Sequence, residues 1–189
     1  MADDTRTRIQ AVALELFTEQ GYDATSLREI AERLGVTKAA LYYHFKSKEE
    51  IVESMMADHL VRLEELLKEY AGQPITHERR LEFLQRYHEN LSISQHFKLM
   101  KFFQQNQPAV KNMPNATRWR ETLGRMLTML VGEDASATER MRVGLAIFGL
   151  HVSWTLLPDD SFSDAERQEA ALAVARQLID QPSEVEAQT

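Results

Sequence analysis

Basic, hydroxyl-bearing and aromatic side chains gather in residues 25–48, although the chain as a whole carries a net charge of −7. Within this segment five Lys and Arg side chains outnumber two Glu side chains, which gives a local charge of +3. Residues 49–189 carry the whole acidic excess of the chain. Clustered cations neutralise phosphates, and hydroxyl groups donate hydrogen bonds to them. The chemistry open to this segment is therefore the binding of a phosphate-rich partner.

Residue combinations that support catalysis are missing from the sequence. It has no cysteine, no glycine-rich loop and no His-x-x-x-His or Glu-x-x-His spacing. The nearest acidic pairs are sequence neighbours, expected on solvated helix faces or in a loop. His44 has no second ligand at metal-binding spacing, so we expect it to donate a hydrogen bond instead. We expect no enzyme activity, no catalytic residue, no metal and no cofactor.

Helix-start signals divide the chain into the elements that must hold these groups. Four Ser-x-x-Glu patterns precede apolar periodic runs, which is typical of capping boxes in which serine and glutamate bind each other's backbone amides. These patterns begin at Ser26, Ser47, Ser136 and Ser163. After the glycine turn at Gly35, Thr37 is expected to cap a further short helix.

Apolar spacing predicts helices along the whole chain and no strand. The predicted helices cover residues 6–19, 26–34, 37–43, 47–70, 76–93, 94–105, 116–131, 136–157 and 163–179. Breaks are expected at Gly21, Gly72, Pro74, Pro108, Pro114, 132–134 and 158–160. Residues 182–189 form a polar tail that is expected to fray.

Length and composition favour an all-α fold with one or two small domains. Of the 189 residues 43% are hydrophobic, and only 7 Gly and 5 Pro are present, so helix formers outweigh turn formers. We expect a helix-turn-helix domain at residues 1–48 and a helical bundle at residues 49–181. No apolar run approaches the roughly 18 residues that a membrane span needs, so we expect a cytoplasmic protein.

The segments 9–17, 21–31 and 34–48 resemble the DNA-binding domain of the tetracycline-repressor (TetR) family. Two short helices across a glycine turn form the helix-turn-helix, and the stretch Leu-Tyr-Tyr-His-Phe-Lys-x-Lys at 41–48 is the most specific part. The remaining residues match only in helical character and length. The resemblance implies a homodimeric, nine-helix transcriptional regulator, usually a repressor that a small molecule releases from DNA.

A helix that docks end-on in the major groove offers its first turn to base edges. Ala40 and Leu41 are expected to face the core. Lys38 could donate hydrogen bonds to guanine, and Ala39 could touch a thymine methyl group. The residues expected on the exposed face of the helix are Thr37, Lys38, Ala39 and Tyr42.

Further residues are expected to position the DNA. Arg28 is a second candidate for base contact, by analogy with the family and because a guanidinium group suits guanine. Hydroxyl, imidazole and ammonium groups near the two short helices could donate to backbone phosphates. The residues expected in this role are Thr25, Ser26, Tyr42, Tyr43, His44 and Lys48.

Aromatic and Met side chains in the middle helices could line a pocket for a partly apolar effector. Core packing is the more common role of any single residue in such a stripe. Helical bundles nevertheless often bind ligands between facing helices, and Met makes an adaptable wall. The candidates are Phe83, Tyr87, His88, Phe97, Met100, Phe103, Trp119, Met126, Phe148 and His151.

The helices at 136–157 and 163–179 are expected to form a homodimer interface. Apolar and small residues surround the segment 142–157, which demands burial on every side. Gly144 and Gly149 would allow a neighbouring helix to approach closely. The last helix is expected to contribute Ala171, Leu172, Ala175, Leu178 and Ile179.

These observations predict a regulator that binds double-stranded DNA at a near-palindromic operator. We expect a repressor, with activation as the lesser variant. The alternative is a helical adaptor or architectural protein that uses the helix-turn-helix for protein contacts and has no ligand. Sequence-specific, salt-dependent DNA binding distinguishes the two, because an adaptor would lack it.

Overall fold

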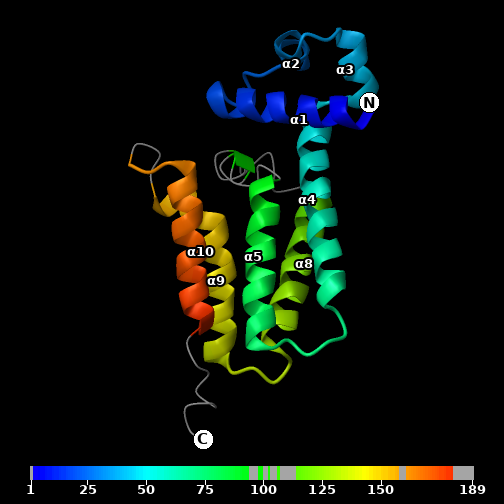
Figure 1. Ribbon diagram of the computed structural model, residues 1–189. Helices are drawn as coiled ribbons and strands as arrows, with labels where there is room; N and C mark the ends of the chain where they lie inside the picture. Colours follow the sequence, from blue (N-terminus) through cyan, green and yellow to red (C-terminus); the bar gives the residue numbers. More distant parts are fainter. Residues whose placement is uncertain are drawn as a thin grey trace, which may run out of the picture. The chain divides into compact units, whose positions relative to one another are not determined.

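The computed structural model describes residues 2–93, 98, 99, 102, 106, 114–157 and 161–180. These residues form eight helices and no strand (Figure 1), so the predicted all-α fold is confirmed. The helices are α1 (Ala2–Glu19), α2 (Leu27–Leu34), α3 (Lys38–His44), α4 (Lys48–Tyr70), α5 (His77–Ile93), α8 (Pro114–Val131), α9 (Ala137–Leu156) and α10 (Asp164–Asp180). Most of the predicted helix at 94–105 and the predicted tail at 182–189 lie outside the described residues.

Most helix boundaries fall within two residues of the prediction. The first helix is an exception, because α1 begins at Ala2 rather than at residue 6. Pro114, expected to break a helix, instead begins α8. Proline suits this first position because its ring sets a helical φ and its missing N–H would have had no partner there.

The chain divides into two compact units, which we call the head and the body. The head contains Met1–Leu60 and Lys98–Arg118, and the body contains Val61–Phe97 and Trp119–Thr189. The head therefore extends past the predicted boundary at residue 48. Ile51 and Val52 of α4 are fully buried in its core, which explains why the first turns of α4 belong to it.

The helices of the head enclose one apolar cluster. Gly35 makes the turn between α2 and α3 with a φ of 73°, a left-handed conformation that favours glycine. The turn is closed by a hydrogen bond of 3.0 Å from the Val36 amide to the Ala31 carbonyl. This turn orients α3 so that Leu41 lies in the core. The largest buried members of the cluster are Ile9, Phe17, Ile30, Leu41, Phe45, Ile51 and Phe102.

Two of the four predicted capping boxes are complete. Ser26 and Glu29 cap each other at α2, and Ser163 and Glu166 do so at α10. The other two serines accept the expected amide hydrogen bond, but their glutamates bind elsewhere. Glu50 accepts from the Lys46 amide at 2.5 Å, and Glu139 accepts from Arg80 at 2.9 Å.

The body is a helical bundle with its own core. Residues from the end of α4 and from α5, α8, α9 and α10 form it, and α9 and α10 pack most extensively against each other. Arg167 is buried and donates to the Leu157 carbonyl at 2.7 Å, which ties the start of α10 to the end of α9. The large buried side chains of this core include Leu63, Leu66, Tyr70, Phe83, Tyr87, Met126, Ile147 and Leu150.

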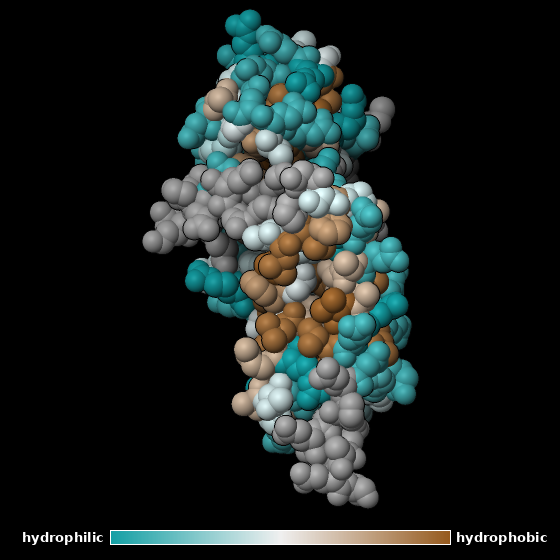
Figure 2. All heavy atoms as spheres, turned by 90° about the vertical axis from the view of Figure 1, so that its left-hand side faces the viewer, coloured by the Kyte–Doolittle hydropathy of each residue, from teal (hydrophilic) through white to brown (hydrophobic). Residues whose placement is uncertain are grey.

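Helix α9 is apolar on opposite sides, which fits the prediction of apolar residues all round it, but only one side is buried within the protomer. One face, with Val143, Ala146 and Leu150, is buried in the body. The opposite face, which we call the outer face of α9, consists of large exposed side chains without polar atoms, and Figure 2 shows apolar surface on this side of the body. The outer face contains Met141, Leu145, Phe148 and Leu156, which are 64%, 49%, 59% and 70% exposed.

The contribution predicted for α10 needs correction. Ala171, Ala175 and Ile179 are buried in the core of their own body, because they face α9 and α5 rather than solvent. Leu172 and Leu178 are partly buried against the same core. The large apolar side chain that α10 does expose is Val174, which is 54% exposed.

Candidate DNA-binding surface

The first turn of α3 presents its side chains to solvent. The Thr37 hydroxyl accepts a hydrogen bond from the Ala40 amide at 3.1 Å and so caps the helix. Lys38 and Ala39 are exposed, as predicted. Ala40 is exposed too, which corrects the prediction that it faces the core, since Leu41 supplies the buried contact of α3.

Aromatic side chains follow on the next turn. Tyr42 is 36% exposed and Tyr43 is 79% exposed. The Lys38 ammonium lies over the Tyr42 ring, 5.4 Å from its centroid, and the Tyr43 ring meets the His44 ring edge-on at 5.2 Å. A cation and two phenol hydroxyls therefore lie on one short helix, each able to donate to an acceptor in solvent.

Thr25 and Ser26 act at the start of α2 in ways that differ from the prediction. Thr25 is only 2% exposed, and its hydroxyl donates to the Gly21 carbonyl at 2.8 Å and accepts from Gln20 at 3.2 Å. The structure therefore contradicts the prediction that this hydroxyl binds phosphate. Ser26 is exposed, but its hydroxyl is committed to the capping box with Glu29.

Two predicted cations lie differently from each other. Arg28 is exposed and pairs with Glu32 on the next turn at 2.7 Å, a bond that costs little to break because both side chains face solvent. Lys48 is turned inward, with its ammonium donating to the Tyr22 carbonyl at 2.5 Å and lying 4.4 Å from the Tyr22 ring centroid. This geometry contradicts a free phosphate clamp at Lys48.

Two other cations were missed as candidate site residues. Lys46 is exposed, and its ammonium donates to the Tyr42 carbonyl at the end of α3. Arg6 of α1 places its guanidinium 5.0 Å from the centroid of the Phe45 ring. Lys46 was visible only as part of the local charge, and nothing in the spacing of the sequence connects Arg6 with residue 45.

Two of the acidic groups near these cations are held in their charged form. Hydrogen bonds from Ser26 lower the pKa of Glu29, and hydrogen bonds from its own backbone amide and from Ser47 lower the pKa of Glu49. These carboxylates accept from helix-start amides, where negative charge is favourable. They are thereby tied to the scaffold, while Lys38 and the tyrosines stay open to a partner.

Several of the residues predicted to bind an effector lie together in the core of the body, and others do not. In the core of the body the Tyr87 hydroxyl lies 3.0 Å from His151 Nε2, and the Trp119 ring meets the His151 ring at 5.7 Å. Phe83 and Met126 belong to the same core and are at most 1% exposed. Burial lowers the pKa of His151 to about 4, so the imidazole is neutral at pH 7.

The other candidates do not join this cluster. His88 is half-buried on α5, and burial lowers its pKa. Phe148 lies on the outer face of α9, which contradicts its predicted place in a pocket. Phe97, Met100 and Phe103 lie outside the described residues.

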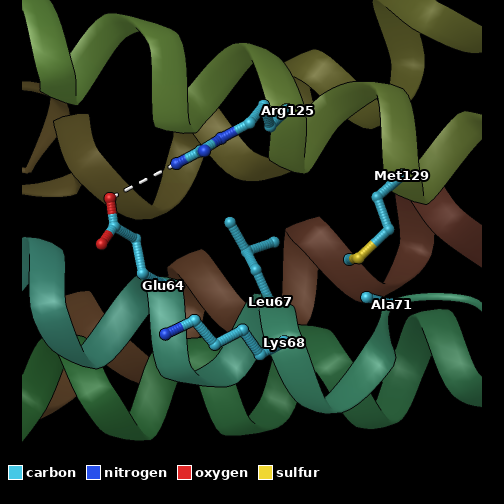
Figure 3. A pocket seen from close by; sticks show the side chains of 6 residues that line it. All are labelled: Glu64, Leu67, Lys68, Ala71, Arg125 and Met129. Atoms are coloured by element: carbon cyan, nitrogen blue, oxygen red, sulfur yellow. Dashed lines mark hydrogen bonds and ion pairs between the residues drawn. The ribbon is translucent and has the colours of Figure 1, made fainter.

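The body has a pocket that the predicted residues do not line. It holds about 340 Å³ and lies between the end of α4 and α8, lined by Glu64, Leu67, Lys68, Ala71, Arg125 and Met129 (Figure 3). The spacing of the four α4-side positions places them on one helix face. Three of the lining residues are charged, which in a sequence is typical of a solvated surface and explains why they were missed.

No group of three or more His, Cys, Asp or Glu among the described residues could hold a metal ion. None of the described helices is both long enough and apolar enough to cross a membrane.

A family of known proteins matches the sequence of the head. Residues 9–55 match the family of bacterial regulatory proteins called the tetR family. The HTH-type transcriptional regulator AcrR of Shigella flexneri is 44% identical over 69 residues, which are 36% of this chain and 32% of AcrR. IcaR of Staphylococcus aureus (strain Newman), a negative transcriptional regulator of the biofilm operon icaADBC, is 54% identical over 41 residues, 22% of each chain. The chain thus spans only about a third or less of the length of these relatives.

The fold is shared over a much longer stretch. A TetR-family transcriptional regulator from Bordetella parapertussis superposes with a TM-score of 0.67, covering 93% of this chain and 94% of that chain at 20% identity. The head thus contains a helix-turn-helix, formed by α2 and α3 across the turn at Gly35. The tetR-family match covers residues 9–55, and the likeness to the solved structure over the longer stretch is one of fold.

Proposed function

We propose that the protein is a sequence-specific transcriptional regulator that inserts α3 into the major groove of operator DNA. The observation that carries this proposal is the free first turn of α3, where Lys38 and Ala39 stand exposed on a head whose apolar core is complete. A helix end with small and basic side chains suits base edges. The regulatory role in the names of AcrR and IcaR supports the proposal, and the negative role of IcaR favours repression.

The outer face of α9 supports a homodimer as the binding form. Its apolar side chains are stabilised when contact with another apolar surface removes them from water. A two-fold axis would pair this face with its own copy on a second protomer. A Cβ added at Gly144 or Gly149 would meet nothing within 4 Å inside the protomer, which leaves room for a neighbouring helix. In such a dimer two copies of α3 would read half-sites about 34 Å apart in a near-palindromic operator.

A partly apolar small molecule is proposed as the effector that releases the DNA. Release requires the effector to bind the DNA-incompetent form more tightly, and a hundredfold loss of operator affinity needs about 2.7 kcal/mol of such preference. By reciprocity, operator DNA would weaken effector binding by the same factor. We propose that the protein binds DNA in the cytoplasm, where bacterial DNA lies.

Selection of bound sites from random duplex DNA by the full chain tests the proposal. We expect enrichment of a near-palindrome and an affinity that falls steeply with salt concentration, because phosphate contacts release counterions. A selection that enriches no sequence, combined with binding of a protein partner through the head, would favour the adaptor.

A further inference from the structure

The pocket between α4 and α8 has a polar end and an apolar end. At one end Arg125 and Glu64 form an ion pair of 3.3 Å, and at the other Met129 lies near Ala71, with Leu67 between the ends (Figure 3). Its volume of about 340 Å³ is at the low end of the range for ligand pockets, roughly 300–1,000 Å³. The dimensions therefore suit a small molecule with one polar group.

The charged side chains that line the pocket have a net positive charge. Arg125 uses Nη2 for both Glu64, at 3.3 Å, and the Thr122 hydroxyl, at 3.0 Å, and a guanidinium has five N–H donors in total. Lys68 is exposed and forms no ion pair with any described residue. Two cations thus accompany one carboxylate, so the lining carries a net charge of +1.

We propose that this pocket binds a small monocarboxylate with an apolar tail. The carboxylate would lie at Lys68 and Arg125, and the tail would lie against Leu67, Ala71 and Met129. A monoanion neutralises the lining, whereas a dianionic phosphate would leave a net negative charge beside Glu64. The flexible thioether of Met129 lets the apolar end adapt to tails of different shape.

This inference deepens the proposed function, on which it rests only for the regulatory meaning of the ligand. Lys68 and Leu67 lie on α4, whose first turns form part of the core of the head. The ligand site is distinct from the cluster of Tyr87, His151 and Trp119. Binding of the ligand to this pocket can be measured without DNA, and binding of DNA can be measured without the ligand.

Octanoate is the probe, titrated into the full chain with ¹³C-labelled methionine methyl groups and followed by NMR. Met129→Leu assigns the resonance at the pocket, and Met126→Leu assigns one in the core. We expect octanoate to shift the Met129 signal saturably in about the millimolar range, as suits a ligand of this size in an open pocket. Octanamide, which has the same tail without the charge, should bind about fivefold more weakly.

Matched variants locate the carboxylate. Lys68→Met keeps the aliphatic stem but removes the charge, and should raise the Kd for octanoate about fivefold. Lys98→Met makes the same change at an exposed position outside the pocket and should leave the Kd unchanged. An unmoved Met129 signal, equal binding of octanamide, or a Met126 signal that responds before Met129 overturns the proposal.

Selection of bound sites from random DNA distinguishes failure of the proposed DNA-binding function from failure of the proposed ligand site. A chain that binds octanoate at Met129 but selects no DNA removes the proposed function and leaves the ligand site standing. A chain that selects an operator but fails the octanoate titration removes only the ligand site.

Discussion

The head and the body both expose large side chains, but those side chains differ in chemistry. On the head, Tyr42 and Tyr43 end in hydroxyl groups and lie among cations. On the body, Leu145, Phe148 and their neighbours on the outer face of α9 carry no polar atom. A phenol can face water and phosphate, whereas an aliphatic or phenyl group is stabilised only by leaving water. The exposed side chains of the head therefore suit a polar partner, whereas the outer face of α9 suits another apolar surface.

A charge on the outer face of α9 should have the largest effect on operator affinity. Leu145→Asp would place a carboxylate in the proposed dimer interface, so we expect monomers and at least a hundredfold loss of operator affinity, or about 2.7 kcal/mol. Sedimentation velocity and electrophoretic mobility shifts measure the two effects. Val61→Asp is the matched control, because Val61 is 46% exposed on α4. A Leu145→Asp dimer with full affinity would show that this face is not the interface.

Removing a buried ring should have the largest effect on the stability of the head. Phe102 is fully buried, with its ring centroid 5.5 Å from those of Phe17 and Tyr22, so Phe102→Ala should destabilise the head by about 3–5 kcal/mol. Hydrogen exchange of the α1 and α2 amides reports this loss. Phe162→Ala, at a side chain 40% exposed, should change exchange little. Unchanged exchange in Phe102→Ala would place residue 102 outside the core of the head.

The stability of the body should depend on pH through His151. Its pKa is about 4 when folded and about 6.5 when unfolded, so the unfolded chain takes up the proton first as the pH falls. The free energy of unfolding should therefore drop by about 3 kcal/mol between pH 6.5 and pH 4. Urea titrations followed by Trp fluorescence measure this slope, and His151→Gln should flatten it. Since His88 has a lowered pKa too, part of the slope should remain; equal slopes in parent and variant would contradict the assignment.

On the head, removing a base-reading side chain should cost less in affinity but change specificity. Lys38→Ala should lose about 1–3 kcal/mol at each half-site and relax the preference at one base pair. Binding to a panel of operator variants with single substitutions measures both. Uniform weakening across the panel would instead show that Lys38 contacts only phosphate.

The smallest expected effect is the loss of one hydroxyl. Tyr42→Phe should weaken binding by about 0.5–1.5 kcal/mol, equally for all operator variants, because a phosphate contact does not read sequence. The dependence on salt should not change, since no charge is removed. A selective loss at one base pair would mean that the hydroxyl touches a base.

Local signals explain how much of the fold could be predicted. The capping box at Ser26 and the glycine at Gly35 act within a few residues, so the boundaries of α2 are visible in the sequence. The two apolar faces of α9 follow from composition alone, although only the packing decides which face is buried. Pro114 is the instructive exception, because the same residue either ends a helix or begins one.

Contacts between distant residues explain what could not be predicted. Lys48 is a residue type that often binds phosphate, which is why it was predicted to do so. Its ammonium instead donates to the carbonyl of Tyr22, 26 residues earlier in the chain. Phe102 was expected in the second domain, although its partners in the head are Phe17 and Tyr22. The pocket at Glu64 and Arg125 joins positions 61 residues apart, and neither position carries a signal by itself.

The inward hydrogen bond of Lys48 has a mechanical consequence. Together with the bonds from Gln10 to Ser54 at 2.9 Å and to Asp58 at 2.7 Å, it fastens the first three turns of α4 to α1 and to the loop that precedes α2. These turns are therefore part of the same compact unit as the helix-turn-helix. A rotation of these turns would therefore carry α3 with it without repacking the core of the head.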